Sequence, residues 1–316
     1  MAKSALTLGV DLGGTNIQAG LLSAEGKLLA RDSTKTKADE GAEAVLKRIV
    51  KLCDGILEAA GVDHDDVAGM GVGAPGALDV SKGVVIEAVN LRWNDFPLAK
   101  KLGEMAEMPV VIDNDVNVGA WGEYHAGAGT EGQDMLAVFI GTGIGGGLII
   151  NDRLYHGHFF TAGEIGHTTV AAHASIGRRT VENLASRNSM VLLIQKLIMS
   201  NHPSWLVEAT EGDLGKIRSK LLAQAVKKQD PLAVEVVAHA AEVVGIAIAN
   251  AVTLLSLPQV VVGGGLAEAM GDGLIKRIRE AFDRHVFPGE LKKCKLVASK
   301  LGDDAGVIGA ALLARE

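Results

Sequence analysis

Hydrophobic positions along this chain fall into short apolar runs separated by glycine-rich turns, and into longer stretches with helical spacing. The stretch 136–150 reads LAVFIGTGIGGGLII: an apolar run, a turn dense in glycine and a second apolar run. The segment 6–22 reads LTLGVDLGGTNIQAGLL and repeats that design around a Gly-Gly-Thr turn. Two such strand–turn–strand segments predict a duplicated domain in which both glycine turns face one ligand.

The first third of the chain predicts a hairpin, a further strand, a helix and another strand. Apolar residues between 40 and 60 recur at helical spacing and stop at Gly61, a typical helix C-terminus. The loop GAPGALD follows the last of these strands, because Gly73, Pro75 and Gly76 force the chain to turn. In chain order we expect strands over 6–10, 17–22 and 27–35, a helix over 40–60, a strand over 67–72 and, after Pro97, another helix.

A short strand over 109–112 is expected to run into three consecutive polar residues and then into a helix that starts near Asn117. The polar residues are Asp113, Asn114 and Asp115. In α/β proteins the carboxyl end of a strand is where ligand groups bind, so this loop is a candidate site.

The second half of the chain opens with the 136–150 hairpin, continues through a long loop to 179 and becomes largely helical from 180 to about 257. A buried strand over 259–262 runs directly into a triple-glycine turn and a helix. We therefore expect an α/β protein of two lobes. The small lobe would comprise 1–117 with a C-terminal helix, about 303–316, that packs back on it, and the large lobe would comprise 118–302 with a helical insertion.

Composition agrees with an ordinary globular protein. The chain has 316 residues, enough for about two domains, with 48% hydrophobic and 22% charged residues. A net charge of −7 argues against a broad surface for nucleic acid or anionic lipid. The 40 glycines exceed ordinary turn use, so several are expected where the backbone approaches a ligand.

Cysteine usage and hydropathy point to a cytoplasmic protein. Cys53 and Cys294 lie far apart without C-x-x-C spacing, which fits a reducing compartment and gives no cysteine metal site. The start of the chain lacks a basic segment followed by a signal-like apolar core, and no uninterrupted apolar stretch of about 18 residues follows. We expect no membrane partner.

The glycine turns have the chemistry of a phosphate site. In DLGGTN, the N–H groups of Gly13 and Gly14 could point at anionic oxygens, Thr15 adds a hydroxyl, and Asp11 could orient a metal-bound water. The alternative for one turn alone is a tight hairpin. A second such turn, GTGIGGG, favours a nucleotide, although neither turn fits the P-loop or the Rossmann pattern. The third turn, VVVGGGL, could hold an adenosine or simply begin a helix.

Carboxylates and amides near these turns are candidates for binding an alcohol. Asn114 and Asp115 could grip hydroxyls and remove a proton, or could cap a helix. In GEIGH, Glu164 and His167 could bind sugar hydroxyls or a metal, or the histidine could be structural. Glu182 could contact the same ligand or stabilise a helix start.

Seven ordered segments resemble the ROK family of sugar kinases and repressors, and look most like its bacterial glucokinases. The resemblance covers nearly the whole chain. The segments are DLGGTN, GVGAPGALD, VNLRWNDFPL, IDNDVNVGAWGEY, IGTGIGGGLI, AGEIGH and VVVGGG. The resemblance implies the actin-like ATPase fold of hexokinases, related to ribonuclease H, a duplicated two-lobed α/β fold that binds ATP and sugar in its cleft.

The resemblance also implies roles for individual residues. Asp115 would be the general base on the sugar hydroxyl that attacks the γ-phosphorus of ATP. The remaining sugar hydroxyls would be held by Asn114, Glu164, His167, Glu182, Asn90 and the Gly76 loop. The phosphates, arriving with Mg²⁺, would be surrounded by Asp11, Gly13, Gly14, Thr15, Thr142 and Gly143. The adenosine would lie along Gly264 and Gly265.

One segment departs from the family. GEIGH is usually followed by C-x-C-G-x-x-G-C-x-E, whose cysteines join the histidine on a structural zinc. Here the segment is HTTVAAHASIGRRTVEN, without cysteine, and His167 and His173 cannot complete a four-ligand site. We therefore expect no zinc, and a loop held by packing or by Arg178 and Arg179.

Three functions are compatible with these residues. The first is an ATP-dependent hexose kinase acting on the 6-hydroxyl of glucose, with N-acetylmannosamine, N-acetylglucosamine, mannose, fructose and allose as alternative sugars. The second is a sugar-responsive repressor, which the acidic charge and the roughly ten residues before Asp11 disfavour. The third is a sugar-binding protein without catalysis, which the presence of Asp115 disfavours. Family members often dimerise, so the apolar helices between 190 and 255 would form either a homodimer contact or core.

Overall fold

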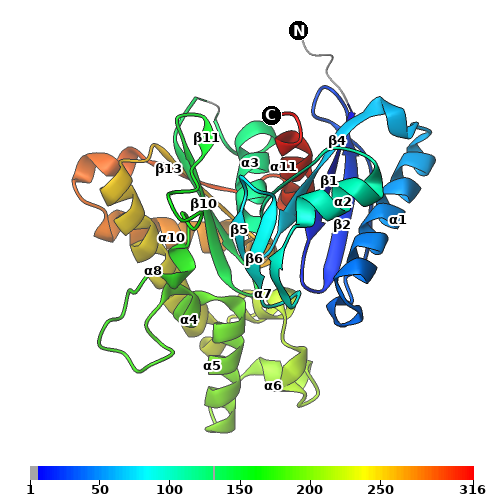
Figure 1. Ribbon diagram of the computed structural model, residues 1–316. Coiled ribbons are helices and arrows are strands. Elements are labelled where there is room, and N and C mark those ends of the chain that lie inside the picture. Colours follow the sequence, from blue (N-terminus) through cyan, green and yellow to red (C-terminus); the bar gives the residue numbers. More distant parts are fainter. Residues whose placement is uncertain (1–5, 131) are drawn as a thin grey trace. The chain divides into compact units, whose positions relative to one another are not determined.

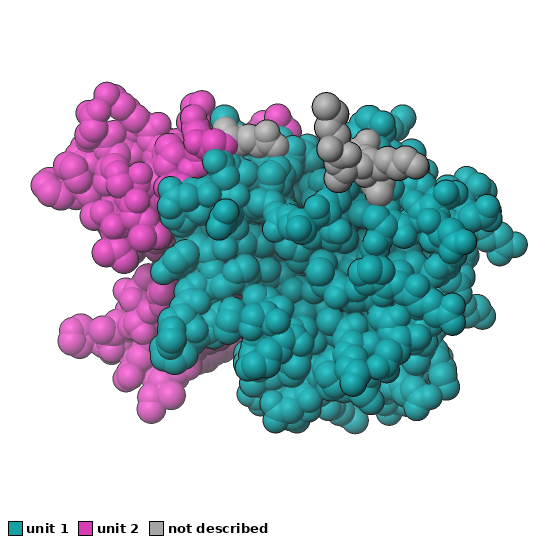
Figure 2. Space-filling view, turned by 45° about the horizontal axis from the view of Figure 1, so that its top comes forward, with its two compact units in different colours: residues 1–131, 147–162, 303–316 teal, residues 132–146, 163–302 magenta. Residues whose placement is uncertain are grey.

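The computed structural model describes residues 6–130 and 132–316. The chain folds into two compact units, drawn in different colours in Figure 2. Unit 1 contains residues 1–131, 147–162 and 303–316, and unit 2 contains residues 132–146 and 163–302.

A five-stranded sheet forms the centre of unit 1 (Figure 1), with the strand order β3-β2-β1-β4-β8. Strands β1, β2 and β3 are antiparallel neighbours, while β4 and β8 run parallel to β1. The apolar runs predicted from the sequence therefore form strands. Their bounds are β1 Leu6–Leu12, β2 Asn16–Leu22, β3 Leu28–Lys35, β4 Val67–Ala74 and β8 Val110–Asn114.

Helices α1 (Ala42–Ala60) and α2 (Leu98–Ala106) pack on one face of this sheet. The apolar residues of α1 are buried against those of β1 and β2 in a common core. As the sequence predicts, α1 ends at Gly61, which adopts the left-handed conformation and donates its backbone N–H to the carbonyl of Glu58. Glycine takes this conformation without the steric cost of a Cβ.

A small antiparallel sheet was not expected from the sequence. It consists of β5 Ala77–Asp79, β6 Val84–Ala88 and β7 Trp93–Phe96. The prediction of loop is wrong at β5 and β7, and no element is predicted at β6, because each strand is too short to display an alternating pattern and turn residues separate all three. Gly76 lies in the turn between β4 of the main sheet and β5, and Asn90 lies in the turn between β6 and β7.

Helices α3 (Asp115–Ala126) and α11 (Ala305–Leu313) lie on the face of the main sheet opposite α1 (Figure 1). Their backbones approach so closely that a Cβ on Gly309 would overlap the carbonyl oxygen of Val118. A Cβ on Gly71 of β4 would likewise overlap the carbonyl oxygen of Ala310. Glycine at these positions lets α11 lie directly on both α3 and the sheet.

Unit 2 is built on three parallel strands with β12 between β9 and β13. All five residues of β12 are buried, as its continuous apolar sequence predicts. The strand bounds are β9 Met135–Ile140, β12 Gln259–Gly263 and β13 Lys295–Ala298. The helices are α4 Val181–Ala185, α5 Arg187–Met199, α6 Trp205–Ala209, α7 Ser219–Lys227, α8 Pro231–Leu255, α9 Gly265–Met270 and α10 Asp272–His285.

The chain passes from unit 2 into unit 1 within β10 (Ile144–Ile150), and β11 (Arg153–Leu154) pairs with the unit 1 end of β10.

Helix α8 is long and apolar enough, with a mean hydropathy of 1.9, to cross a membrane by length and composition. However, 67% of its most apolar window is buried inside the protein, where it packs against α4 and α10. Polar residues such as Glu235 and Glu242 interrupt its sequence. Helix α8 is therefore a core helix of unit 2.

The compact units divide the chain differently from the lobes expected near residue 117. Helix α3 and residues 147–162 belong to unit 1, because α3 packs tightly on α11 and the sheet. The division into lobes 1–117 with 303–316, and 118–302, remains a prediction.

Candidate functional site

Two strands of unit 1 bring acidic residues to the same edge of the sheet. Asp11 on β1 and Asp113 on β8 are both register partners of Gly73 on β4, the strand between them. Because these strands are parallel, their carboxyl ends meet at one edge. Asp115 follows immediately as the first residue of α3. A Cβ on Gly73 would clash with Val118, so this glycine makes room for the first turn of α3 over the strand.

The first glycine turn joins β1 to β2 at this edge. The N–H of Gly13 donates to the carbonyl of Asn16 at 2.9 Å, and the carbonyl of Gly13 accepts the hydroxyl of Thr36 at 2.7 Å. A Cβ on Gly14 would lie 2.9 Å from the Cβ of Asn90, so the structure brings these two predicted site residues together. With Thr15 and three cationic residues they line a cavity of about 540 Å³; the cations are Lys35, Lys37 and Arg92.

Asp11 has an unusual titration behaviour. Burial raises the pKa of its carboxyl to about 7, and the negative charges of Asp115 and Asp303 act in the same direction. Three carboxylates therefore share one region of unit 1. A cation bound nearby would favour the ionised form of Asp11.

Asn114 connects the start of α3 to the Gly76 turn. Its side-chain oxygen accepts the N–H groups of Val116 at 2.9 Å and Asn117 at 3.4 Å, so Asn114 is the helix N-cap. Its side-chain nitrogen donates to the carbonyl of Gly76 at 3.2 Å. The side chain of Asn114 therefore caps α3 and is also a candidate for binding a ligand. The helix begins at Asp115, two residues earlier than predicted, because of this cap.

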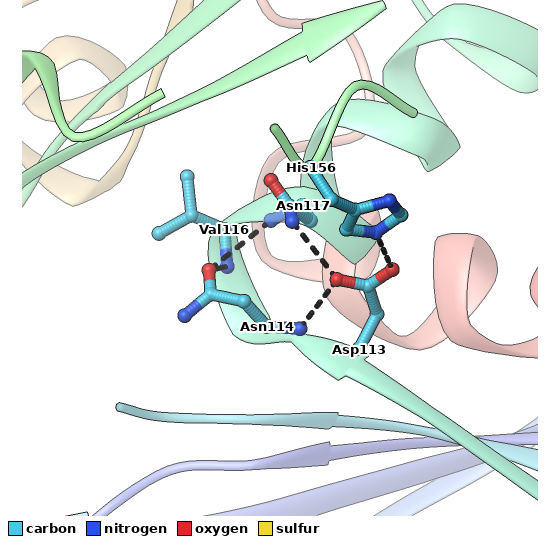
Figure 3. Close-up of polar contacts among 5 residues, drawn as sticks. All are labelled: Asp113, Asn114, Val116, Asn117 and His156. Carbon is cyan, nitrogen blue, oxygen red and sulfur yellow. Dashed lines mark hydrogen bonds and ion pairs between the residues drawn. The ribbon is translucent and has the colours of Figure 1, made fainter. Parts of the chain in front are cut away.

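A buried network surrounds Asp113, immediately before these residues (Figure 3). Asp113 is 2% exposed and accepts hydrogen bonds from the backbone of Asn114, the side chain of Asn117 and the ring of His156. The hydrogen bond to Asp113 raises the pKa of His156, while partial burial of the ring acts in the opposite direction. The sequence analysis did not identify His156, because a single histidine in a loop carries no pattern.

The second glycine turn lies in unit 2 and contacts Glu182. The carboxylate of Glu182 accepts the N–H of Ile144 at 2.8 Å, and a Cβ on Gly143 would clash with that carboxylate. The hydroxyl of Thr142 accepts a hydrogen bond from the guanidinium of Arg187 at 2.9 Å. The structure thus brings Thr142, Gly143 and Glu182 together, and adds a cation, Arg187, which the sequence analysis did not single out.

Glu164 and His167 lie on a short helical turn of unit 2. Their side chains are 3.8 Å apart between Oε2 and Nε2 and are exposed, 54% for Glu164 and 67% for His167. Both side chains are therefore accessible to a ligand. The turn is fixed by the N–H of His167, which donates to the carbonyl of Glu164 at 3.1 Å.

The segment 168–182, which departs from the family pattern, is held by backbone pairing. The N–H of Val181 donates to the carbonyl of Thr168, and the N–H of Val170 donates to the carbonyl of Arg179. The guanidinium of Arg179 donates to the carbonyl of Ala174 at 2.8 Å, as one of the two expected arginine contacts. Within residues 6–130 and 132–316, the structure contains no group of three or more histidine, cysteine or acidic side chains placed to bind a metal ion.

The third glycine turn, also in unit 2, leads from β12 into α9. Gly264 has φ +87°, and a Cβ there would lie 2.7 Å from the backbone nitrogen of Ile140. Glycine is required by both the conformation and the close backbone approach. Gly265 begins α9, and a Cβ there would meet no atom within 4 Å. The surface at Gly265 is therefore open.

The predicted site residues thus form two sets. Within unit 1 lie Asp11, Gly13, Gly14, Thr15, Gly76, Asn90, Asn114 and Asp115. Within unit 2 lie Thr142, Gly143, Glu164, His167, Glu182, Gly264 and Gly265.

Comparison with known proteins identifies relatives over nearly the full length. A glucokinase from Halalkalibacterium halodurans is 35% identical over 98% of this chain and 94% of its own length. A glucokinase from Streptomyces coelicolor is 32% identical over 98% of both chains. The crystal structure of a ROK family glucokinase from Streptomyces griseus, in complex with glucose and AMPPNP, superposes with a TM-score of 0.86 and 33% identity over 98% of this chain and 99% of that one.

These matches confirm the fold expected from the sequence, the two-lobed actin-like ATPase fold. The model of the ROK family matches residues 7–316. The glycine turns, the DND loop (residues 113–115) and the GEIGH loop (residues 163–167) occur in the order described, and the chain belongs to the ROK family.

Proposed function

We propose that this protein is an ATP-dependent hexose kinase that transfers the γ-phosphate of ATP to the 6-hydroxyl of glucose. The glucokinase relatives at 32% and 35% identity support this activity, as does the similarity to a structure solved with glucose and an ATP analogue. The enzyme uses a sugar and ATP as its small-molecule partners.

The proximity of Asp115 to Asp11 is the single observation that carries the proposal. Asp115 begins α3 at the sheet edge, and its charge contributes to the raised pKa of Asp11 beside the first glycine turn. A carboxylate that can accept a hydroxyl proton thus lies in the same unit as a turn suited to phosphate. Phosphoryl transfer needs this combination of positioning and charge neutralisation.

Asp115 is assigned as the general base. Its carboxylate takes the proton of the sugar 6-hydroxyl as the hydroxyl oxygen bonds to the γ-phosphorus, and the bond from that phosphorus to the β-phosphate oxygen breaks. The products are a sugar 6-phosphate, ADP and the proton on Asp115. The Val116 N–H donates to Asp115 Oδ1 at 3.0 Å, so one oxygen of this carboxylate is hydrogen-bonded to the first turn of α3.

Each unit carries residues that are candidates for the other hydroxyls of the sugar. In unit 1, Asn114 and Asn90 would bind them beside the Gly76 turn, and the 3.2 Å bond between Asn114 and Gly76 supports a common surface. In unit 2, Glu164 and His167 are exposed enough to bind a sugar. The contact of Glu182 with the second glycine turn supports a role for it between sugar and phosphates.

MgATP is the proposed phosphoryl donor. Mg²⁺ would arrive bound to the phosphates of ATP, and its charge near Asp11 would offset the repulsion from Asp115 and Asp303 that raises the Asp11 pKa. Mg²⁺ supplies charge neutralisation on the phosphates. The N–H groups of Gly14, Thr15, Thr142 and Gly143 would bind phosphate oxygens, while Gly13 shapes the first turn through its bond to Asn16. The open surface at Gly265, next to Gly264, would accept the adenosine.

Three further properties belong to the same proposal. The enzyme would bind no structural zinc, since backbone pairing between 168 and 181 already orders the segment that zinc holds in the family. It would act in the cytoplasm. It would form a homodimer through unit 2, where Leu192, Met199 and Leu254 expose 65%, 80% and 83% of their surface.

A coupled ADP-release assay with MgATP and a panel of sugars tests the activity. We expect turnover with glucose, and the panel includes N-acetylmannosamine, N-acetylglucosamine, mannose, fructose and allose. Asp115→Asn should lose at least about 10³-fold in kcat while still binding glucose. Asp54→Asn, an exposed substitution on α1, is the control and should keep full activity. ADP release that no sugar stimulates, or full activity of Asp115→Asn, would contradict the mechanism.

A further inference from the structure

Asp113 is the one residue of the DND loop without an assigned role. It is buried, with 2% of its surface exposed, and it lies near the end of β8, directly before Asn114 and Asp115. We propose that Asp113 and His156 form a positioning pair that holds Asp115 in the orientation required to accept the hydroxyl proton. This inference rests on the proposed function, because it takes Asp115 as the base.

One carboxylate oxygen of Asp113 binds the chain on both sides of Asp115. Its Oδ1 accepts the backbone N–H of Asn114 at 2.7 Å and the side-chain Nδ2 of Asn117 at 2.9 Å. Asn114 precedes Asp115, and Asn117 follows it within the first turn of α3. The position and tilt of that first turn therefore depend on where the Asp113 carboxylate lies.

The second carboxylate oxygen is fixed by His156. The ring Nε2 lies 2.6 Å from Asp113 Oδ2, and Figure 3 shows the ring approaching the carboxylate from the side opposite Asn114. With donors on both oxygens, the carboxylate cannot rotate about its Cβ–Cγ bond without losing a hydrogen bond in a buried place. Such a loss leaves a buried polar group without its partner, which disfavours the rotated position.

His156 itself is held independently of the DND loop. Its carbonyl accepts the N–H of Ala162 at 3.1 Å, and the N–H of the preceding Tyr155 donates to the carbonyl of Leu148 at 2.9 Å. The same hairpin binds α3 further along, where the hydroxyl of Tyr124 donates to Asp152. The backbone that carries the ring is thus held within unit 1, and Asp113 links the ring to the residues on either side of Asp115.

The expected contribution follows from the geometry of proton transfer. A base must lie within hydrogen-bond reach of the hydroxyl, and a displacement of about 1 Å can cost about 10²-fold in rate. Removing the His156 donor frees one Asp113 oxygen, so Asp115 loses its fixed orientation. The cap bonds made by Asn114 persist, so sugar binding should change less than turnover.

Steady-state kinetics of His156→Ala and His156→Gln test the pair, together with glucose affinity by calorimetry. We expect His156→Ala to lower kcat at least tenfold, with the KM for MgATP and the glucose Kd each changed less than threefold. His156→Gln supplies an amide donor of similar reach and should restore kcat to within about threefold of wild type. His285→Ala is the matched control, since His285 makes an equally short contact with a carboxylate, 2.7 Å to Glu242, in unit 2 and away from these residues.

Thermal unfolding of each variant separates positioning from a purely structural role. If His156→Ala only lowers the melting temperature and keeps its kcat, measured well below that temperature, the inference is wrong. If His156→Ala does not accumulate as a folded protein, the comparison of His156→Gln with His156→Asn decides instead. The shorter amide should lose at least tenfold in kcat, and equal rates for the two would overturn the inference.

Asp115→Asn distinguishes failure of this inference from failure of the proposed function. If Asp115→Asn abolishes turnover while the His156 variants keep theirs, only the positioning role is refuted. If Asp115→Asn keeps its activity, both the function and the inference fall. In the double variant Asp115→Asn, His156→Ala, we expect no loss beyond that of Asp115→Asn, because the two residues act through one step. If the loss of kcat in the double variant equals the product of the two single losses, the residues act independently and the inference is wrong.

Discussion

Replacing Asp11 by asparagine should raise the stability of the protein and lower its turnover. The gain in stability should depend on pH. In the folded protein the pKa of Asp11 rises from its ordinary 3.8 to about 7, because of burial and the charges of Asp115 and Asp303. In the unfolded chain it returns to its ordinary value. The folded state therefore holds a proton between about pH 4 and pH 7 that the unfolded state has released.

The sign of the effect follows from this difference. As the pH rises from about 4 to about 7, wild-type stability falls, because the unfolded state is favoured by loss of the proton. Above pH 7 the full penalty is present. The difference in pKa corresponds to at most about 4 kcal/mol, and residual solvent contact of the partly buried side chain reduces the expected penalty to about 1–3 kcal/mol.

The substitution Asp11→Asn keeps the size of the side chain and removes the charge. We expect its free energy of unfolding to exceed that of wild type at pH 8 by about 1–3 kcal/mol, with a smaller gain at pH 5. Urea unfolding without nucleotide or Mg²⁺, followed by fluorescence of Trp93 and Trp121, both buried in unit 1, measures the difference. Turnover with MgATP should fall at least about 10²-fold.

Asp304→Asn is the control for this experiment. Asp304 lies near the start of α11 and is ion-paired with Arg31, so its removal loses an attractive contact and should give no gain at pH 8. The reasoning is refuted if Asp11→Asn is less stable than wild type at pH 8, or if its gain is the same at pH 5 and pH 8.

Three further predictions concern other parts of the molecule. Gly309→Ala should destabilise the protein by more than about 3 kcal/mol, because the added methyl overlaps the Val118 carbonyl, whereas Gly273→Ala in α10, where a Cβ meets nothing within 4 Å, should be neutral or stabilising by up to about 1 kcal/mol in thermal unfolding. Glu182→Gln should raise the KM values for both sugar and MgATP, since the carboxylate accepts the Ile144 N–H at the second glycine turn; a variant with unchanged kinetics would place Glu182 outside the site. Elemental analysis of protein purified with added zinc should find well below one zinc per chain, and about one tightly bound zinc would contradict the proposal that backbone pairing between 168 and 181 suffices.

Local sequence patterns predicted those parts of the fold that local physics determines. Helix α1 and its end at Gly61 follow from apolar periodicity and from glycine, and β12 follows from its continuous apolar run. The strands β5, β6 and β7 have three to five residues each, too few to show a pattern. Their formation depends on pairing with one another, which the sequence of each does not encode.

The same distinction applies to the candidate site. The DND loop could be found because its residues are adjacent and follow a strand, and the start of α3 differed from prediction only because Asn114 caps it. His156 meets Asp113 across 43 positions of sequence, and Glu182 meets Ile144 across 38. No local pattern relates such partners, so only the folded chain reveals them.

The close contact between α3 and α11 has a consequence for attempts to change the sugar that the enzyme accepts. At Gly122 and Gly309 the two helices meet backbone to backbone, so main-chain atoms set how closely α3 packs on α11. Directed evolution has almost no side chain to alter at this contact. Libraries aimed at a new substrate should therefore leave it intact and vary exposed positions, such as Asn90 and the solvent-facing residues of the loop 168–182.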